Sequence, residues 1–233
     1  MRNFTKAAAA LTALAAATMM AGAAHAEGKA DGKIQFKVLA TAVLPDGAVK
    51  QVKTDVLGLV PAAVGNTVAS DNVTPTVSIE YFFTPNISVE TIAGVTAHHV
   101  SASAGALKGT ELISKIHIVP ATLTAKYHLP LGHGIKPYIG AGPALFIVLA
   151  DEPSAALKAA LPAVTRTKLS SEFGVALQGG IDIALGKGYG LSFDAKKYWV
   201  GTDATVYAGS TRALVTRNKL DPWVLSAGVS YRF

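Results

Sequence analysis

Residues 221–233, at the end of the chain, alternate between apolar and small or polar side chains, as a β-strand does. The apolar side chains on one face of this strand are Trp223, Leu225, Ala227, Val229, Tyr231 and Phe233. A soluble domain gains little from an apolar strand at its terminus, because terminal residues fray. A closed barrel in a bacterial outer membrane needs an apolar outward face with aromatic residues at the interface. We therefore expect a membrane barrel, with Val229, Tyr231 and Phe233 as its assembly signal.

The amino terminus predicts export. Arg2 and Lys6 precede an apolar run at residues 7–17, and Ala24 and Ala26 are small residues at the two positions that signal peptidase recognises. We expect residues 1–26 to be a signal peptide, cleaved to leave one barrel domain at 27–233. A membrane-anchoring helix is the alternative, but the run is shorter than the about 20 residues that a spanning helix needs.

The composition excludes several classes of function. The mature chain would keep 207 residues, enough for one domain, and the loss of Arg2 and Lys6 lowers the net charge from +6 to +4. This charge is small and evenly spread, so we expect no nucleic-acid partner. The chain contains no cysteine, which excludes disulfides, thiolate metal sites and thiol catalysis.

Eight segments alternate with a period of two and can be read as strands. In all of them except the fifth, one face consists of apolar residues and carries no charge. The fifth segment is rich in glycine, and its inward and outward faces cannot be assigned. The seventh loses its alternation at Lys196 and Lys197, which predicts a β-bulge there. The segments are residues 33–42, 76–83, 87–96, 121–129, 136–149, 172–183, 191–196 and 223–233.

The connections between these segments alternate in length. Short links at 84–86, 130–136 and 186–190 alternate with long links at 44–72, 99–114, 150–169 and 200–220. Short turns on one rim and long loops on the other are typical of outer-membrane barrels. We therefore expect an all-β fold, an eight-stranded antiparallel transmembrane β-barrel of the bacterial outer membrane, with both termini periplasmic. A soluble sandwich or a lipocalin-like barrel would also show alternation, but neither explains the loop asymmetry.

Five stretches in order along the mature chain resemble the OmpW family of small outer-membrane barrels, which includes the alkane-uptake AlkL proteins. The resemblance implies a narrow channel for small hydrophobic molecules, with outer-membrane lipid, lipopolysaccharide and the barrel assembly machinery as partners. The long link at 44–72 matches nothing in the family pattern, and Lys196 with Lys197 departs from an apolar lumen. The matching stretches are 75–83 with 86–90, 119–127, 137–142, 173–182 and 221–233.

The inward faces of the predicted strands carry several charged side chains. An eight-stranded barrel has room inside for side chains or one small ligand, but for no open aqueous pore. Because burying an unpaired charge is costly, we expect these residues to form a salt-bridge network, with a specific polar ligand site as the alternative. The predicted network consists of Glu80, Glu90, Lys126, Asp182, Asp194, Lys196 and Arg232.

Three apolar residues are candidates for a hydrophobic path. Ile92 lies on an inward-facing position and could form a constriction or simply fill space. Leu57 and Leu59 belong to a long link that is unusually apolar for an exposed loop, which suits the capture of a hydrophobic solute. In another long link, Ser154 is a candidate N-cap for a short helix at the outer rim.

Catalysis and metal binding find little support in the sequence. His98 and His99 are adjacent on a strand and should point to opposite faces, which is poor geometry for one metal. A lipid hydrolase that uses serine and histidine lacks a nucleophile elbow. Residues 186–190 look like a phosphate loop but lack its spacing, so we expect a turn. We expect no enzymatic activity, no metal and no cofactor. A structural or receptor-surface barrel that transports nothing is the main alternative to the channel.

Overall fold

The computed structural model describes residues 32–60 and 64–233. The predicted signal peptide at 1–26 lies outside these residues. The described elements are β1 (Ile34–Leu44), β2 (Ala48–Asp55), β3 (Asn66–Ala69), β4 (Asn72–Phe82), β5 (Ile87–Ala93), β6 (Thr96–Ala104), β7 (Glu111–His128), β8 (Ile135–Pro153), α2 (Ala155–Ala160), β9 (Arg166–Leu169), β10 (Glu172–Gly186), β11 (Tyr189–Trp199), β12 (Gly201–Ala208), β13 (Thr211–Lys219) and β14 (Trp223–Arg232).

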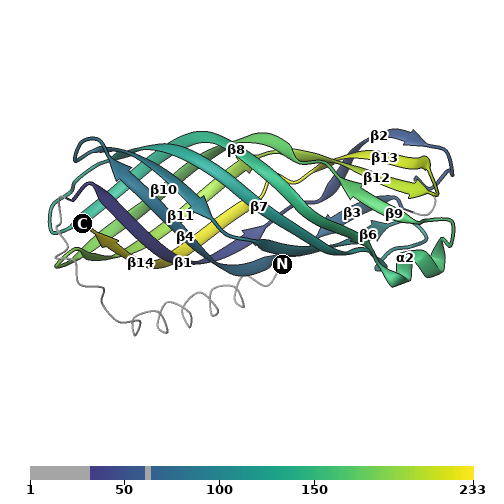
Figure 1. The fold of residues 1–233 in the computed structure, drawn as a ribbon, viewed down its shortest axis with the longest axis horizontal. Coiled ribbons are helices and arrows are strands. Elements are labelled where there is room, and N and C mark those ends of the chain that lie inside the picture. The colour runs from purple at the N-terminus through teal and green to yellow at the C-terminus, as the bar shows by residue number, and fades with distance from the viewer. Residues whose placement is uncertain (1–31, 61–63) are drawn as a thin grey trace.

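Antiparallel pairing closes the longer strands into a barrel (Figure 1). The order around the barrel is β1, β4, β5 with β6, β7, β8, β10, β11 and β14, and β14 pairs with β1 to complete it. Because β5 and β6 follow each other along the same side of β7, they form one barrel strand. The predicted eight-stranded barrel is therefore confirmed. The carboxyl terminus and the short turns lie at the same end, which we assign to the periplasm.

The alternation in the sequence corresponds to the two faces of the barrel wall. In β4, for example, Ser78 and Glu80 are buried inside, whereas Val77, Ile79 and Tyr81 are exposed outside. The fifth predicted strand, β8, can now be assigned: Tyr138, Ala144 and Phe146 are buried on its inward face.

The predicted β-bulge at Lys196 and Lys197 is wrong. β11 keeps an unbroken register through this point with β10 and β14, so Lys196 faces the lumen and Lys197 faces outward. Lys197 lies at the outer rim, where its ammonium donates to the Asp221 carbonyl and lies 5.3 Å from the Trp223 ring centroid. A lysine at an interface can extend its charged end toward water, so its outward position needs no bulge.

The four long connections are folded. β2, β13, β12 and β9 form a separate four-stranded sheet beyond the barrel wall, and β3 extends the wall beside β6. The predicted helix is present as α2, and the Ser154 hydroxyl accepts a hydrogen bond of 2.9 Å from the Leu157 amide as its N-cap. β7 and β8 contain 18 and 19 residues, whereas a membrane-spanning strand needs about 9–11. The barrel therefore extends well beyond the membrane on the loop side.

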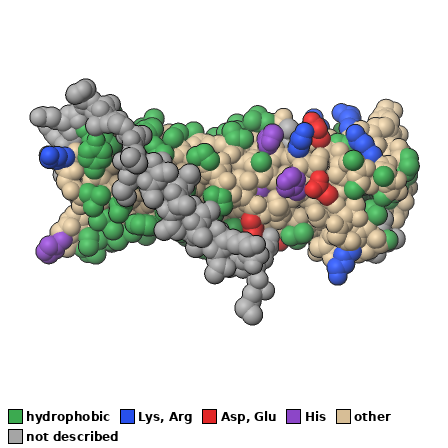
Figure 2. All heavy atoms as spheres, turned by 90° about the horizontal axis from the view of Figure 1, so that it is seen from below, with side chains coloured by type: hydrophobic (Ala, Val, Ile, Leu, Met, Phe, Trp, Pro, Cys, Tyr) green, Lys and Arg blue, Asp and Glu red, His purple; other side chains and the backbone are tan. Residues whose placement is uncertain are grey.

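The outer surface identifies the part of the barrel that lies in the membrane. Exposed apolar side chains such as Ile79, Leu123 and Ile139 cover the wall near the short turns. Exposed aromatic residues border this belt, with Tyr189 and Phe233 at the periplasmic end and Trp199, Trp223 and Phe173 at the outer end. Figure 2 shows charged side chains gathered toward the loop end. Separately, none of the helices in the described part of the chain is long and apolar enough to span a membrane.

Candidate functional site: an apolar cavity above a charged layer

Lys37 occupies the centre of the charged layer inside the barrel. Its ammonium lies 2.9 Å from Glu80, 3.1 Å from Glu90 and 3.3 Å from Asp182, and all four side chains are buried. These residues come from β1, β4, β5 and β10, so the contacts cross the lumen. Three carboxylates around one ammonium compensate for the cost of burying each charge.

Two further lysines extend the layer. Lys126 lies 2.8 Å from Glu80 and 3.0 Å from Glu90, and its ammonium is 3.6 Å from the centroid of the Tyr138 ring. Lys196 lies 2.6 Å from Asp194 and 3.3 Å from Glu90.

Neutral side chains join the carboxylates of the layer into one network. The amide of Gln178 donates to Glu90 at 2.9 Å and to Asp194 at 2.6 Å, and the Tyr138 hydroxyl donates to Asp194 at 2.9 Å. The charged layer, as we use the term, consists of Lys37, Glu80, Glu90, Lys126, Tyr138, Gln178, Asp182, Asp194 and Lys196.

The periplasmic side of this layer contains His128 and Arg232. His128 Nε2 lies 2.8 Å from Glu80, which also accepts a hydrogen bond of 2.5 Å from Ser88. The guanidinium of Arg232 lies 3.6 Å from the centroid of the Phe82 ring and donates to the Gly32 carbonyl at 2.6 Å. A small cavity of about 50 Å³ lies between His128 and Arg232 at this end.

Hydroxyl groups cover the charged layer on its outer side. Thr41 lies within hydrogen-bond distance of Thr76 and Ser226, at 2.6 and 2.9 Å. The Tyr198 hydroxyl lies 3.1 Å from that of Thr122. These groups satisfy one another, so the lumen changes from charged to neutral within a short distance.

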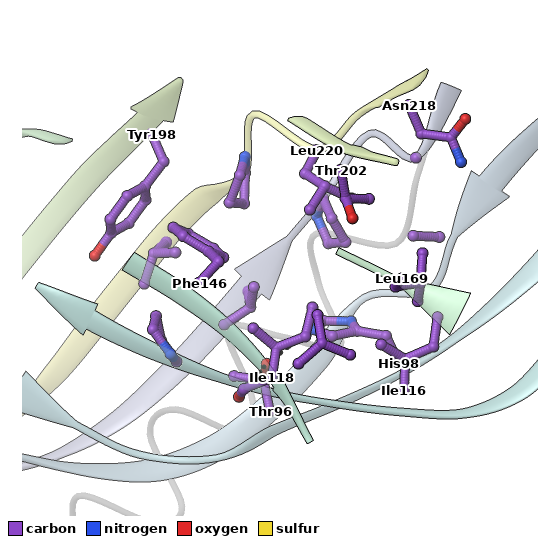
Figure 3. A pocket seen from close by; sticks show the side chains of 18 of the residues that line it. Thr96, His98, Ile116, Ile118, Phe146, Leu169, Tyr198, Thr202, Asn218 and Leu220 are labelled. Carbon is purple, nitrogen blue, oxygen red and sulfur yellow. Dashed lines mark hydrogen bonds between the residues drawn. The ribbon is translucent and has the colours of Figure 1, made fainter. Parts of the chain in front are cut away.

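Above the hydroxyl groups lies a cavity of about 60 Å³, lined mostly by apolar side chains (Figure 3). By the usual measure one water molecule needs about 10–15 Å³, so the cavity can hold a small solute or a few waters. Ile116, Ile118, Phe146 and Leu169 contribute apolar surface, and His98 is a polar residue of the lining. This cavity and the periplasmic one have no lining residue in common, and the charged layer lies between them.

The structure brings together six of the seven residues predicted for the network, namely Glu80, Glu90, Lys126, Asp182, Asp194 and Lys196. Arg232 lies next to Phe82 at the periplasmic end and donates to the Gly32 carbonyl. The prediction missed Lys37, although Lys37 was already on the polar face of its segment. It also missed Tyr138, Gln178 and His128.

The residues predicted for a hydrophobic path lie apart from one another. Ile92 is buried and lines the apolar cavity. Leu57 is exposed on the loop side and Leu59 is buried there, but neither lines the cavity. Sequence reasoning missed Ile116, Ile118 and Phe146, which do line it. Ile116 and Ile118 could have been found from the alternation in residues 112–118, which precede the predicted fourth strand.

His98 and His99 lie on β6, and residues 186–190 connect β10 to β11. His98 and His99 point to opposite faces: His98 is buried inside, and His99 is exposed. The described part of the chain contains no group of three or more acidic or histidine side chains that could hold a metal ion. Residues 186–190 form the tight turn between β10 and β11, in which Gly186 and Gly188 adopt φ angles of 100° and 80°.

A closed antiparallel barrel with an apolar outer belt, an internal charged layer and long extensions at one end defines an integral protein of the bacterial outer membrane. The chain belongs to the OmpW family, whose model matches residues 30–233. Barrels of this family are non-enzymatic membrane proteins, in agreement with the expectation of no enzymatic activity.

Individual relatives support the same assignment. An uncharacterized outer-membrane protein, y4mB of Sinorhizobium fredii, is 33% identical over 164 residues, which cover 70% of this chain and 67% of that protein. The dibenzothiophene metabolism operon protein PahQ of Pseudomonas aeruginosa is 31% identical over 169 residues, with coverage of 72% and 75%. The crystal structure of the outer-membrane protein OprG from Pseudomonas aeruginosa covers 89% of this chain and 98% of its own, with a TM-score of 0.72 at 22% identity.

Proposed function

We propose that this barrel lets small, uncharged hydrophobic molecules pass from the cell exterior into the outer membrane. The observation that carries the proposal is the apolar cavity on the outer side of a closed charged layer. An apolar solute can exchange water for the side chains of Ile116, Ile118 and Phe146, and each buried CH₂ group gains about 0.8 kcal/mol. The same solute gains nothing from the ion pairs below.

The charged layer argues against an exit through the lumen. To pass it, an apolar molecule would have to separate Lys37 and Lys126 from Glu80 and Glu90, which lie 2.8–3.1 Å from them. Breaking buried ion pairs costs several kcal/mol. A solute in the cavity therefore leaves more easily sideways, through the barrel wall.

One place in the wall suits such an exit. β5 ends at Ala93 and β6 begins at Thr96. In the described strands, pairing with β7 is interrupted here, because the last pair of β5 is Ile92–Thr122 and the first pair of β6 is Thr96–Ile118. Between them lie Gly94, which has no side chain, and Pro120, which has no amide hydrogen to donate. Both residues line the cavity, so the pairing of the wall is interrupted where a solute would rest.

The name of PahQ refers to the metabolism of dibenzothiophene, an apolar aromatic compound. This supports a hydrophobic solute here without identifying it. We also propose that Val229, Tyr231 and Phe233 serve as the signal for the barrel assembly machinery, because they lie on the outward face of the last strand.

Uptake into proteoliposomes with lipopolysaccharide in the outer leaflet tests the proposal. A fluorescent, uncharged polycyclic aromatic compound is added outside, and the rise of its emission from the bilayer is followed. Ile92→Asp and Ile116→Asp place a carboxylate in the cavity at a desolvation cost of about 2–3 kcal/mol, so we expect uptake to slow at least about tenfold. Thr211→Asp, at the exposed first residue of β13, is the matched control.

Two outcomes would contradict the proposal. If vesicles without the protein take up the compound as fast as vesicles with it, the protein is a structural or receptor-surface barrel. If an acceptor protein trapped inside the vesicles binds the compound before the bilayer does, the exit is through the lumen and not through the wall.

A further inference from the structure

The outer sheet of β2, β13, β12 and β9 carries a row of residues that the proposed transport does not use. Tyr207 on β12 pairs with Arg166 on one side and with Arg212 on the other. Lys168 follows Arg166 on β9 at the same exposed face. The side chains of Arg166, Lys168 and Arg212 are all exposed. Two arginines are thus the cross-strand partners of one tyrosine, and Lys168 lies two residues along β9 from Arg166.

The side chain of Arg166 is held in a position that suits ligand binding. The guanidinium carbon of Arg166 lies 3.7 Å from the centroid of the Tyr207 ring. Stacking of this kind restricts the guanidinium while its edge stays available for hydrogen bonds. An arginine fork held in this way can bind a phosphate or carboxylate group through two hydrogen bonds.

Nearby acids offset only part of this positive charge. Asp151, whose carboxylate interacts with Lys168 and Arg166, accepts a hydrogen bond from the Leu169 amide. Asp203 forms ion pairs with Lys53 at 2.6 Å and with Arg217 at 3.2 Å.

Asp55, at the end of β2, accepts hydrogen bonds from the amides of Leu59 and Val60 at 2.8 and 2.7 Å. The single carboxylate of Asp151 cannot neutralise all three cations of Arg166, Lys168 and Arg212.

The position of the sheet indicates which anion it meets. β12 begins two residues after Trp199, one of the aromatic residues at the outer border of the membrane belt, and Tyr207 lies six residues further along β12. At about 3.3 Å per residue, the eight residues from Trp199 to Tyr207 place the row roughly 26 Å along the chain from this border. The sugars of lipopolysaccharide occupy this region, and their phosphate and carboxylate groups are anionic.

We propose that Arg166, Tyr207, Arg212 and Lys168 form a docking surface for the anionic core sugars of lipopolysaccharide in the surrounding outer leaflet. The cations bind phosphate or carboxylate groups, and the exposed part of the Tyr207 ring packs against a sugar ring. Docking would hold the outer sheet within the sugar layer and keep the way to the cavity clear. The inference rests on the outer-membrane location of the protein and not on the proposed transport.

Binding of a purified, phosphorylated core oligosaccharide to the barrel in lipid nanodiscs tests the surface, with titration calorimetry as the readout. We expect Arg166→Gln with Arg212→Gln to weaken binding at least about tenfold, and higher salt to weaken the wild type. Arg166→Lys with Arg212→Lys keeps the charge without the fork, so its affinity should be intermediate.

The matched control is Lys108→Gln with Lys115→Gln, which removes two exposed positive charges from the β6–β7 side of the molecule. Its affinity should stay within about twofold of wild type. Equal losses in the two double variants would mean that total charge alone attracts the oligosaccharide, and this would overturn the docking surface. Absence of wild-type binding, or equally tight binding of an oligosaccharide whose phosphate and carboxylate groups have both been removed, would also overturn it. Heat-dependent migration in SDS gels verifies that every variant is folded.

Discussion

Replacement of Lys37 by methionine tests whether the charged layer holds the barrel together. The ammonium of Lys37 contacts Glu80 at 2.9 Å, Glu90 at 3.1 Å and Asp182 at 3.3 Å. Methionine has a similar length and no charge, so the three carboxylates lose a shared partner with little change in packing. Removal of one partner from a buried ion pair costs about 3–5 kcal/mol. Because Lys126 still contacts Glu80 and Glu90, we expect the lower end of this range, about 3 kcal/mol.

Urea unfolding of the barrel in lipid vesicles measures the loss. With a slope near 3 kcal/mol per molar urea, a loss of about 3 kcal/mol lowers the unfolding midpoint by about 1 M. Lys53→Met is the control, because Lys53 forms a pair of 2.6 Å with Asp203 but its side chain is 41% exposed. An exposed pair contributes about 0–1 kcal/mol, so its midpoint should fall by no more than about 0.3 M.

A second substitution tests the physical reason. Glu80→Gln, added to Lys37→Met, removes one of the carboxylates that the first change left with fewer partners, so part of the lost stability should return. If Lys37→Met lowers the midpoint no more than Lys53→Met does, the carboxylates do not depend on Lys37. The reasoning about the layer is refuted in that case.

Three further predictions concern the barrel, its assembly and its outer charges. The extracted protein should resist SDS at room temperature and migrate differently after boiling, and a mature protein that stays soluble without detergent would contradict the barrel. Phe233→Asp should leave precursor in the periplasm in pulse-labelling experiments, yet cost the finished barrel only about 0–1 kcal/mol; normal insertion would refute the assembly signal. Desolvation acts to raise the pKa of Asp203, but hydrogen bonds from Lys53 and Arg217 outweigh it and hold the pKa below its usual value. Asp203 should therefore make a small contribution to the stability of the fold at every pH above the ordinary carboxyl pKa. This contribution is lost as the pH falls through the lowered pKa. Asp203→Asn should thus lower the urea midpoint at pH 7 and leave it unchanged at the acid end, and an equal effect at both would contradict this.

The strands could be predicted because alternation follows directly from strand geometry. In β4 the residues Val77, Ile79 and Tyr81 face lipid while Ser78 and Glu80 face the lumen, so the two environments differ at every step. β8 was harder to assign because the lumen beside its outer half is apolar as well. There Phe146 faces the cavity and its neighbour Leu145 faces outward beside Phe173, and hydrophobicity does not separate the two sides.

The contacts across the lumen could not be predicted to the same extent. Which strands face each other inside a barrel depends on their stagger, and alternation within one strand does not reveal it. Lys37 was therefore left out of the predicted network, although its ammonium contacts three carboxylates. Leu57 and Leu59 show a similar limit, because their exposure depends on how the loop folds.

The pairing of β1 with β14 constrains how the molecule can be made. These strands begin and complete the described fold, and they share ten residue pairs, from Gln35–Arg232 to Leu44–Trp223. Until β14 is available, β1 and β11 each keep an unpaired edge, and the hydrocarbon interior offers no hydrogen bonds to such an edge. Partial insertion is therefore costly, so closure and entry into the membrane should occur together. A chain that stops before Trp223 would then be left for periplasmic proteases and would not form a smaller barrel.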